Sequence, residues 1–243
     1  RDPEMSRGLG DVYKRQWHAE GVTDTPPYEE LEPRFQASIL YNGASWKDRT
    51  IESFVGGSDG FCVWNKEPEP QGRTTTGYYL RKRVDESHDV INENGSVQPV
   101  TIIRLGEVLL NKAEACYRLN DAAGANAAVK AIRDRVGLPY QDKAGENLWK
   151  AIRQERKVEL AYEGQWYWDL RRWKVAHEQY PTGLNGYQVH GLRIEQQPNG
   201  DFVYNYVSVD DKDRNFPERM YRFPLPSGEL SSNAAVSQYP EWK

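Results

Sequence analysis

Two glutamates one helical turn apart, Glu155 and Glu159, are the side chains whose type and spacing most directly indicate chemistry. They lie in the stretch 148–163, where apolar residues recur at the 3.6-residue period of an α-helix. On the helical wheel both carboxylates fall in the middle of the apolar face, where an uncompensated charge is costly. The helix must therefore meet basic side chains from elsewhere or keep the pair for general acid and base catalysis.

Basic residues in the chain favour the first alternative, a structural ion-pair network. Arg171 and Arg172 follow the helix closely, and Arg104 is a more distant donor. We expect these three arginines to compensate Glu155 and Glu159. The alternative is a glycoside hydrolase that uses the two glutamates. Helix geometry disfavours it, because residues about 6 Å apart that point the same way leave no cleft for a substrate between them.

A second pattern with chemical meaning is Gly56-Gly57-Ser58-Asp59-Gly60, which matches the nucleophile turn of serine hydrolases. Asp169 and then His177 or His190 follow it in the chain order of such enzymes. That turn requires a strand before the serine and a helix after it. Two prolines follow shortly instead, so the sequence predicts a glycine-rich hairpin loop.

Aromatic rings beside amide groups form a third pattern. A sugar site needs flat rings against the apolar face of a pyranose and polar groups at the rim. Trp46, which follows Tyr41-Asn42-Gly43, and Trp64-Asn65 near the glycine-rich loop offer this combination, and Trp17 is a further candidate. For each ring the alternative is packing on the core. We assign to packing the tryptophans of the expected helices, Trp149, Trp166, Trp168 and Trp173.

Charge and composition exclude several classes of protein. The 243 residues carry 32 basic and 36 acidic side chains, a net charge of -4, which gives no electrostatic footprint for nucleic acid or an anionic membrane. The two cysteines, Cys62 and Cys116, and the four histidines lie too far apart for a metal site, and no cofactor is expected. No apolar run reaches the roughly 18 residues that span a membrane.

The sequence from 101 to 178 is organised as helices. Asn120-Asp121 predicts a tight turn between a first helix and a second one that ends at Gly137 and Pro139. The stretches 148–163 and 166–178 form a second pair, so the block resembles two stacked hairpins of the tetratricopeptide kind. The core face of the first helix is expected to consist of Ile102, Leu105, Leu109, Ala113 and Cys116.

Outside this block the sequence predicts loops with a few short strands, for example at 35–41 and 202–207. The expected fold class is mainly α, with tetratricopeptide-like helical hairpins, long irregular loops and a few short strands. Residues 1–16 look like translated sequencing-adapter material, and we exclude them from fold reasoning. Residues 17–243 are expected to form one domain with a helical core at about 101–178.

Six segments of the chain resemble, in the same order, the landmarks of the SusD/RagB family, the glycan-capturing outer-membrane lipoproteins of Bacteroidetes. The C-terminal signature is carried by Arg-x-Glu-Arg-x-x-Glu-Leu-Ala-x-Glu-Gly at 153–164 and Trp-Asp-Leu-Arg-Arg-Trp at 168–173. Trp166 departs from the pattern, since the family often carries Arg or His there. The other similar segments are 33–43, 76–82, 103–115, 136–139 and the closing pair 223–226 with 239–242.

This resemblance implies a non-catalytic protein at the cell outer membrane that takes part in polysaccharide utilisation. It would bind a glycan or other nutrient and deliver it to a TonB-dependent transporter of the SusC kind. It also implies a secretory leader and a lipid anchor, which are absent from this sequence, so we expect a C-terminal portion of a longer protein. The ligand-binding candidates are Tyr41, Trp46, Trp64 and Asn65. A helical-repeat interaction module without a sugar ligand stays open as an alternative.

Overall fold

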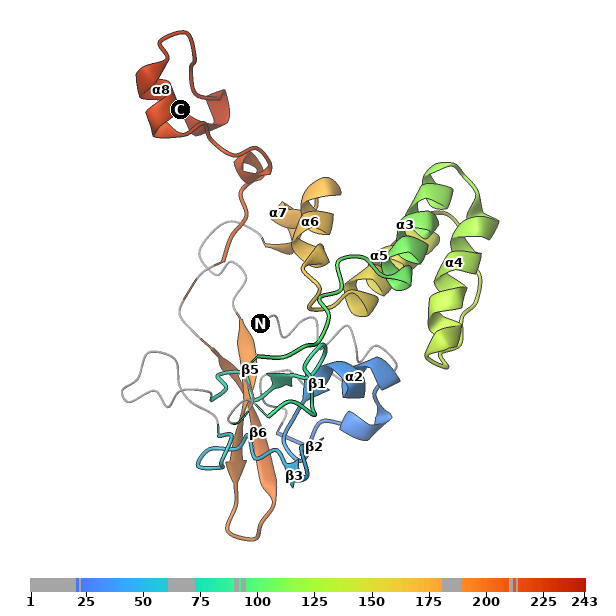
Figure 1. Ribbon diagram of the computed structural model, residues 1–243, viewed down its shortest axis with the longest axis vertical. Helices are drawn as coiled ribbons and strands as arrows, with labels where there is room; N and C mark the ends of the chain where they lie inside the picture. The colour runs from blue at the N-terminus through green and yellow to red at the C-terminus, as the bar shows by residue number, and fades with distance from the viewer. Residues whose placement is uncertain are drawn as a thin grey trace. The chain divides into compact units, whose positions relative to one another are not determined.

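In the computed structural model of the protein, the described residues are 21, 23–60, 73–89, 92, 95–180, 189–209, 212 and 214–243. The chain divides into two compact units. Unit 1 comprises Arg1–Gly164 and Val189–Asp210, and unit 2 comprises Gln165–Gln188 and Asp211–Lys243. Each unit has a core of its own. Figure 1 labels the elements of both units.

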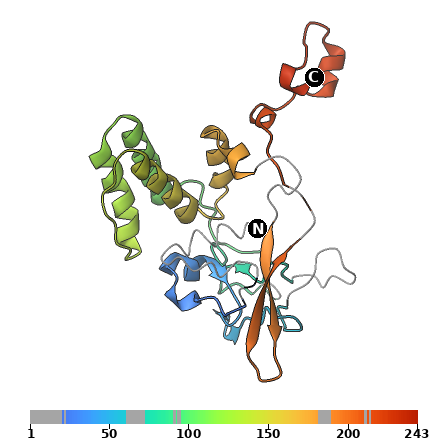
Figure 2. The ribbon, with the colours of Figure 1, turned by 180° about the vertical axis from the view of Figure 1, so that it is seen from behind.

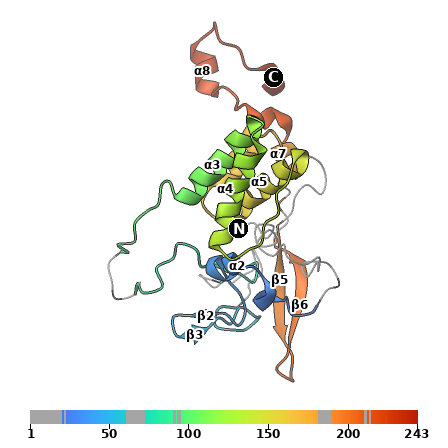
Figure 3. The same cartoon turned by 90° about the vertical axis from the view of Figure 1, so that its right-hand side faces the viewer.

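Three helices of unit 1 lie side by side, α3 (Leu105–Arg118), α4 (Ala122–Arg135) and α5 (Gly145–Glu159) (Figures 1 and 3). The side chain of Asp121 caps α4 by accepting a hydrogen bond of 2.8 Å from the backbone N–H of Gly124. Leu110, Ile132 and Leu160 meet in the core between the helices. The predicted hairpin of α3 and α4 is thus present, with its turn where the sequence placed it.

The core face predicted for α3 is wrong at its N-terminal end. Arg104 is extended and the helix begins only at Leu105, so Ile102 precedes it and cannot share its face. Leu105 is 71% exposed, whereas Leu110 and Ala113 are fully buried. The buried face is therefore rotated relative to the predicted one, which leaves a run of apolar side chains exposed at the start of the helix.

Helix α5 begins three residues before the predicted stretch and ends at Glu159, before the predicted end. Leu148, Ile152 and Val158 are buried on its apolar face, as the periodicity predicted. The helix cannot continue because Tyr162 and Gly164 both adopt positive φ angles, of 64° and 79°. Gly164 therefore lies within the turn that follows the helix.

Among the described residues, the rest of unit 1 contains η1 (Tyr28–Glu30), α2 (Pro33–Ser38) and six strands. The segment expected to be a strand at 35–41 is instead mostly α2, which Pro33 opens at its first turn, and only Ile39–Leu40 is extended. The strands pair antiparallel as β1 (Ile39–Leu40) with β4 (Tyr79–Leu80), β2 (Ser45–Trp46) with β3 (Arg49–Thr50), and β5 (His190–Gln196) with β6 (Phe202–Ser208).

The hairpin of β5 and β6 returns to unit 1 after the chain has passed through unit 2 (Figure 2). Its backbone is joined to the earlier part of the unit by hydrogen bonds of Leu192 N–H to the Thr76 carbonyl at 3.0 Å and of Val55 N–H to the Ile194 carbonyl at 2.8 Å. Leu192, Ile194 and Tyr204 then pack in one core cluster with earlier residues of the unit, among them Phe35 of α2, Ile39 of β1 and Tyr78, which precedes β4. The hairpin strand predicted at 202–207 is confirmed as β6.

Unit 2 is built on α6 (Gln165–Arg172), α7 (Ala176–Gln179), η2 (Glu218–Tyr221), α8 (Ser227–Ser232) and η3 (Pro240–Trp242). Its core consists of Leu170, Ala176 and Phe216, with partly buried rings around them. The expected helix at 166–178 is therefore two helices separated by a turn, in which Lys174 adopts a φ of 57°.

The mainly helical fold class, with few and short strands, is confirmed. Within the described residues, none of the helices combines the length and apolar character that would cross a bilayer.

Candidate functional site

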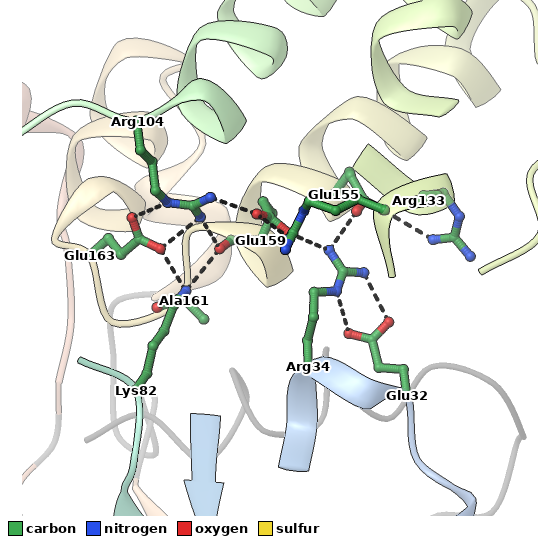
Figure 4. A network of polar contacts seen from close by, with 10 residues as sticks. Glu32, Arg34, Lys82, Arg104, Arg133, Glu155, Glu159, Ala161 and Glu163 are labelled. Carbon is green, nitrogen blue, oxygen red and sulfur yellow. Dashed lines mark hydrogen bonds and ion pairs between the residues drawn. The ribbon is translucent and has the colours of Figure 1, made fainter. Parts of the chain in front are cut away.

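The two glutamates of α5 lie at the centre of a buried polar cluster. Glu155 and Glu159 are 3% and 2% exposed. Arg34 of α2 reaches both: its Nη1 donates to Glu155 Oε1 at 2.6 Å and to Glu159 Oε2 at 3.0 Å (Figure 4). The remaining nitrogens of Arg34 donate to the carboxylate of Glu32 at 3.0 and 2.9 Å. One buried guanidinium thus joins α2 to consecutive turns of α5.

Three further arginines complete the cluster from the helix α4 and from the residue before α3. Arg133 Nη1 donates to Glu155 Oε2 at 3.0 Å, and Arg135 Nη2 lies 2.8 and 2.9 Å from the two oxygens of Glu159. Arg104 Nη1 donates to Glu159 Oε1 at 2.7 Å. All four carboxylate oxygens of the pair therefore accept from guanidinium groups.

The C-terminal end of α5 is held by two cations from the preceding loops. Lys82 Nζ donates to the carbonyls of Glu159 and Ala161 at 2.9 and 3.0 Å, and Arg104 Nη2 donates to the Glu159 carbonyl at 2.7 Å. Both also pair with Glu163, at 2.6 and 2.7 Å. Cations at this position satisfy the last carbonyls of the helix and oppose the negative end of its dipole.

Burial and the neighbouring cations act in opposite directions on the pKa values of the glutamates in this cluster. Burial alone would raise the pKa of Glu159, but the hydrogen bond and charge of Arg104, together with Arg135 and Arg34, outweigh it, so the pKa lies below its usual value. The pKa of Glu163 is also lowered, since Arg104 and Lys82 outweigh its burial. At Glu32 burial outweighs Arg34, and the pKa is raised.

This arrangement suits a structural ion-pair network and does not suit general acid and base catalysis. A general acid needs a carboxyl group that keeps its proton near neutral pH, whereas the pKa of Glu159 is lowered. Both glutamates are also closed off by the arginines that surround them. The geometry therefore ties four segments of unit 1 together through one compensated cluster.

Two arginines proposed for this cluster make other contacts. Arg171 donates to the carbonyls of Met220 and Tyr221 at 2.6 and 3.0 Å, and Arg172 pairs with Asp169 at 2.8 Å. The physical reason is that α6 begins a new compact unit after Gly164. Of the predicted members the structure brings together Arg104, Glu155 and Glu159.

Sequence reasoning missed Arg34, Arg133 and Arg135. The last two were recognisable, because they lie in the final turn of the helix that precedes α5 in the same helical block. No local signal marks Arg34, since its contact with Glu155 spans 121 positions.

The aromatic candidates Tyr41 and Trp46 are both half-buried, and both pack on the small cluster of Leu40, Ala44 and Ile51. The ring of Tyr41 also stacks on Tyr28, with centroids 4.0 Å apart, and its hydroxyl donates to Gln36 at 3.0 Å, so ring and hydroxyl are both engaged within the protein. The other two candidates, Trp64 and Asn65, lie outside the described residues, as does Trp17.

Trp46 stands beside a polar rim. Its cross-strand neighbour is Arg49, and the turn between them uses positive φ angles at Lys47 and Asp48, as two-residue hairpin loops do. Arg49 is fixed by Asp59, whose oxygens lie 2.6 and 2.7 Å from its guanidinium. The carboxylate of Glu52 accepts from the Ser58 hydroxyl at 2.8 Å, so this hydroxyl is engaged within its own loop.

A groove of about 840 Å³ opens in unit 1 between α4, the loop that follows it, and α5. Arg133, Tyr140, Asn147, Lys150 and Gln154 are among its lining residues. The hydroxyl of Tyr140 donates to Asn126 at 2.7 Å, which fixes the ring at the groove wall. Across the described part of the chain, no group of three or more acidic, histidine or cysteine side chains forms a metal site.

The sequence matches the model of the SusD family over residues 6–242, a match that begins inside the segment we set aside as non-native. The SusD-like protein P2 of Formosa agariphila is 32% identical over 144 residues, which cover 54% of this chain and 23% of that protein.

Solved structures with the same fold include a SusD-like protein of Bacteroides fragilis, with 25% identity and a TM-score of 0.73 over 98% of this chain and 46% of that one. A SusD-like carbohydrate binding protein of the same species has 22% identity and a TM-score of 0.68, over 97% and 48%. The chain thus spans about half the length of these two solved proteins.

Proposed function

This chain belongs to the SusD family, and from that premise we propose that it binds an oligosaccharide at the outer surface of the cell without cleaving it. The family match along nearly the whole chain carries the proposal. A relative of the same fold is named as a carbohydrate binding protein, which agrees with it. The state of Glu155 and Glu159 supports the non-catalytic part, because a glycosidase needs one of its two carboxyl groups as a proton donor and the other free to act on the sugar or on water.

The ligand site that we propose in unit 1 is centred on Trp46, with Trp64 and Asn65 as further members. Trp46 supplies an incompletely buried ring, and the Arg49–Asp59 pair beside it supplies donors and acceptors for sugar hydroxyl groups. Tyr41 supports this region from the core, because its ring and hydroxyl are both engaged within the protein.

The first experiment titrates the protein with neutral and charged oligosaccharides and follows tryptophan fluorescence, while reducing-sugar release is measured in parallel. We expect binding without release. Trp46→Ala should weaken binding about 2- to 10-fold, and Trp46→Phe, which keeps an aromatic ring, should lose less. Release of reducing sugar that disappears in Glu155→Gln, with the fold retained, would overturn the non-catalytic proposal.

Delivery to a TonB-dependent transporter and attachment through a lipid anchor are the finer part of the proposal, and family membership supports them. The expected partner is a SusC-like outer-membrane transporter. Co-purification of the two from detergent-solubilised outer membranes tests this, and recovery of the protein without any such transporter would contradict it.

A helical-repeat interaction module without a sugar ligand is the second candidate. It is favoured by the exposed apolar run at the start of α3, where Val100, Ile102 and Leu105 are 87%, 85% and 71% exposed. Contiguous apolar surface of this kind is typical of sites that contact another macromolecule. A folded sample that binds no oligosaccharide in the titration above, but forms a stable complex with a protein, would favour this candidate.

A further inference from the structure

The surface of α6 in unit 2 carries exposed aromatic side chains that the packing of the helix does not explain. Trp166 and Leu170 face the core of the unit, whereas Trp168 is 59% exposed and Tyr167 is 45% exposed. Trp168 lies two positions from Trp166, which places it on the opposite face of the helix. The assignment of Trp168 to packing is therefore wrong.

These rings adjoin an arginine held in a fixed position. Arg171 lies one turn after Tyr167, and its guanidinium carbon is 5.5 Å from the Tyr167 ring centroid and 4.6 Å from that of Phe223. Its Nη1 and Nη2 donate to the carbonyls of Met220 and Tyr221 at 2.6 and 3.0 Å. Tyr167 and Trp168 pack edge to face with centroids 5.1 Å apart. Rings and cation thus form one cluster, Tyr167, Trp168, Arg171 and Phe223.

The charge of this cluster is not compensated within the described part of the chain. Every polar contact of Arg171 there is with a carbonyl or with the Tyr167 hydroxyl at 3.3 Å, and none is with a carboxylate. This contrasts with the cluster around Glu155 and Glu159, whose four surrounding arginines each pair with one of these glutamates: Arg34, Arg104, Arg133 and Arg135. The guanidinium group of Arg171 is held in place, stacks against rings and has no carboxylate partner among the described residues. Such a group is suited to bind an anionic group from outside the protein.

We propose that Tyr167, Trp168, Arg171 and Phe223 bind an acidic sugar residue, with its carboxylate or sulfate ester on Arg171 and its ring against an exposed aromatic face. The choice of a sugar as carrier of the anion rests on the proposed function. The size of the cluster fits it, since four side chains match one or two sugar rings, whereas a stable protein interface takes roughly 20 residues on each side. Trp168 adds an indole N–H that meets no acceptor among the described residues.

The test measures affinity by isothermal titration calorimetry for three oligosaccharides of similar length: an oligogalacturonate, a sulfated galactan fragment and a neutral xylo-oligosaccharide. At low salt we expect one of the two anionic ligands to bind about 10-fold or more tightly than the neutral one, and added salt to reduce the difference. The carboxylated and sulfated ligands distinguish the two kinds of anion.

Variants locate the site. Arg171→Gln should lower the affinity for the anionic ligand about 10- to 100-fold, and Arg171→Lys should recover part of the loss. Arg118→Gln is the matched control, because Arg118 also stacks on a ring, that of Trp149 at 4.4 Å, but belongs to unit 1. If Arg171→Gln unfolds unit 2, Trp168→Ala and Phe223→Ala are measured instead, because both side chains are exposed. Each should lower the affinity for the anionic ligand about 2- to 10-fold.

The outcomes separate this inference from the function it rests on. Equal affinity for neutral and anionic ligands, or anionic binding that survives both Arg171→Gln and Trp168→Ala, overturns this site and leaves glycan binding intact. A folded protein that binds no oligosaccharide overturns both. A protein partner whose binding needs Arg171 and Trp168, in a sample that binds no acidic sugar, also overturns the assignment of a sugar.

Discussion

Nη1 of Arg34 lies 2.6 Å from Oε1 of Glu155, although the two residues are 121 positions apart in the chain. The same nitrogen lies 3.0 Å from Glu159, so one donor group compensates two buried carboxylates. Removal of one partner from such a cluster leaves uncompensated charge in the interior, which costs more than the intact pair contributes.

Arg34→Met is therefore expected to lower the free energy of unfolding of unit 1 by about 3 to 5 kcal/mol, measured by urea denaturation at pH 7. The matched control is Arg49→Met, because the Arg49–Asp59 pair has similar distances but a half-exposed arginine side chain. That control should cost less than about 1 kcal/mol. Similar losses in the two variants would contradict the role of burial in this argument.

The lowered pKa values of Glu159 and Glu163 predict a loss of stability in acid. Since both groups have a lower pKa in the folded state, their contribution is fully present above the unfolded pKa of about 4.3 and is lost as the pH falls through the folded values. Glu32 acts in the opposite direction, because its pKa is raised. We expect stability to decrease below about pH 4.5 in a series of urea titrations.

Glu163→Gln tests the contribution of one of these carboxylates to the pH dependence of stability. The variant should unfold at lower urea concentration than the parent at pH 7, and the two midpoints should approach each other as the pH falls toward 3, because the parent then loses its charge at this position. A constant difference between the midpoints from pH 7 to pH 3 would show that the ionisation of Glu163 does not stabilise the fold.

Local signals predicted much of this fold. The turn at Asn120-Asp121, the cap supplied by Asp121 and the buried face of Leu148, Ile152 and Val158 each depend on residues close together in sequence. The family, indicated by short motifs in a fixed order, is confirmed by the match over residues 6–242. Sequence periodicity also placed the two glutamates on the buried side of α5.

The remainder depended on contacts that local patterns do not encode. The exact partners of Glu155 follow from how α2 and α4 pack on α5, so Arg171 and Arg172 were as plausible in sequence as Arg34 and Arg133. The start of α3 was misplaced because apolar residues continue upstream of the helix without a break in their spacing. Trp168 was assigned to packing because ring type alone does not distinguish a buried aromatic residue from an exposed one.

The rotated face of α3 gives a direct prediction. Leu105→Glu should change the free energy of unfolding by less than about 0.5 kcal/mol, because Leu105 is 71% exposed. Leu110→Ala, in the same helix but fully buried, should cost about 2 to 5 kcal/mol. Thermal and urea denaturation of the two variants check this. A large loss in Leu105→Glu would mean that another part of the protein covers the start of α3.

Two glycines test the close approach of the β5 strand to the Thr76 segment. A Cβ added at Gly191 would lie 2.5 Å from the Cα of Thr76, so the backbone would have to shift to remove the clash. A Cβ added at Gly228 in α8 meets nothing within 4 Å. Gly191→Ala should therefore cost about 1 to 3 kcal/mol, measured by urea denaturation of unit 1. Gly228→Ala should be neutral or stabilise unit 2 by up to about 1 kcal/mol, because alanine is the better helix former and loses less entropy on folding. Equal stability of the Gly191→Ala variant and the parent would show that the hairpin of β5 and β6 does not lie against residues 74–77 in solution.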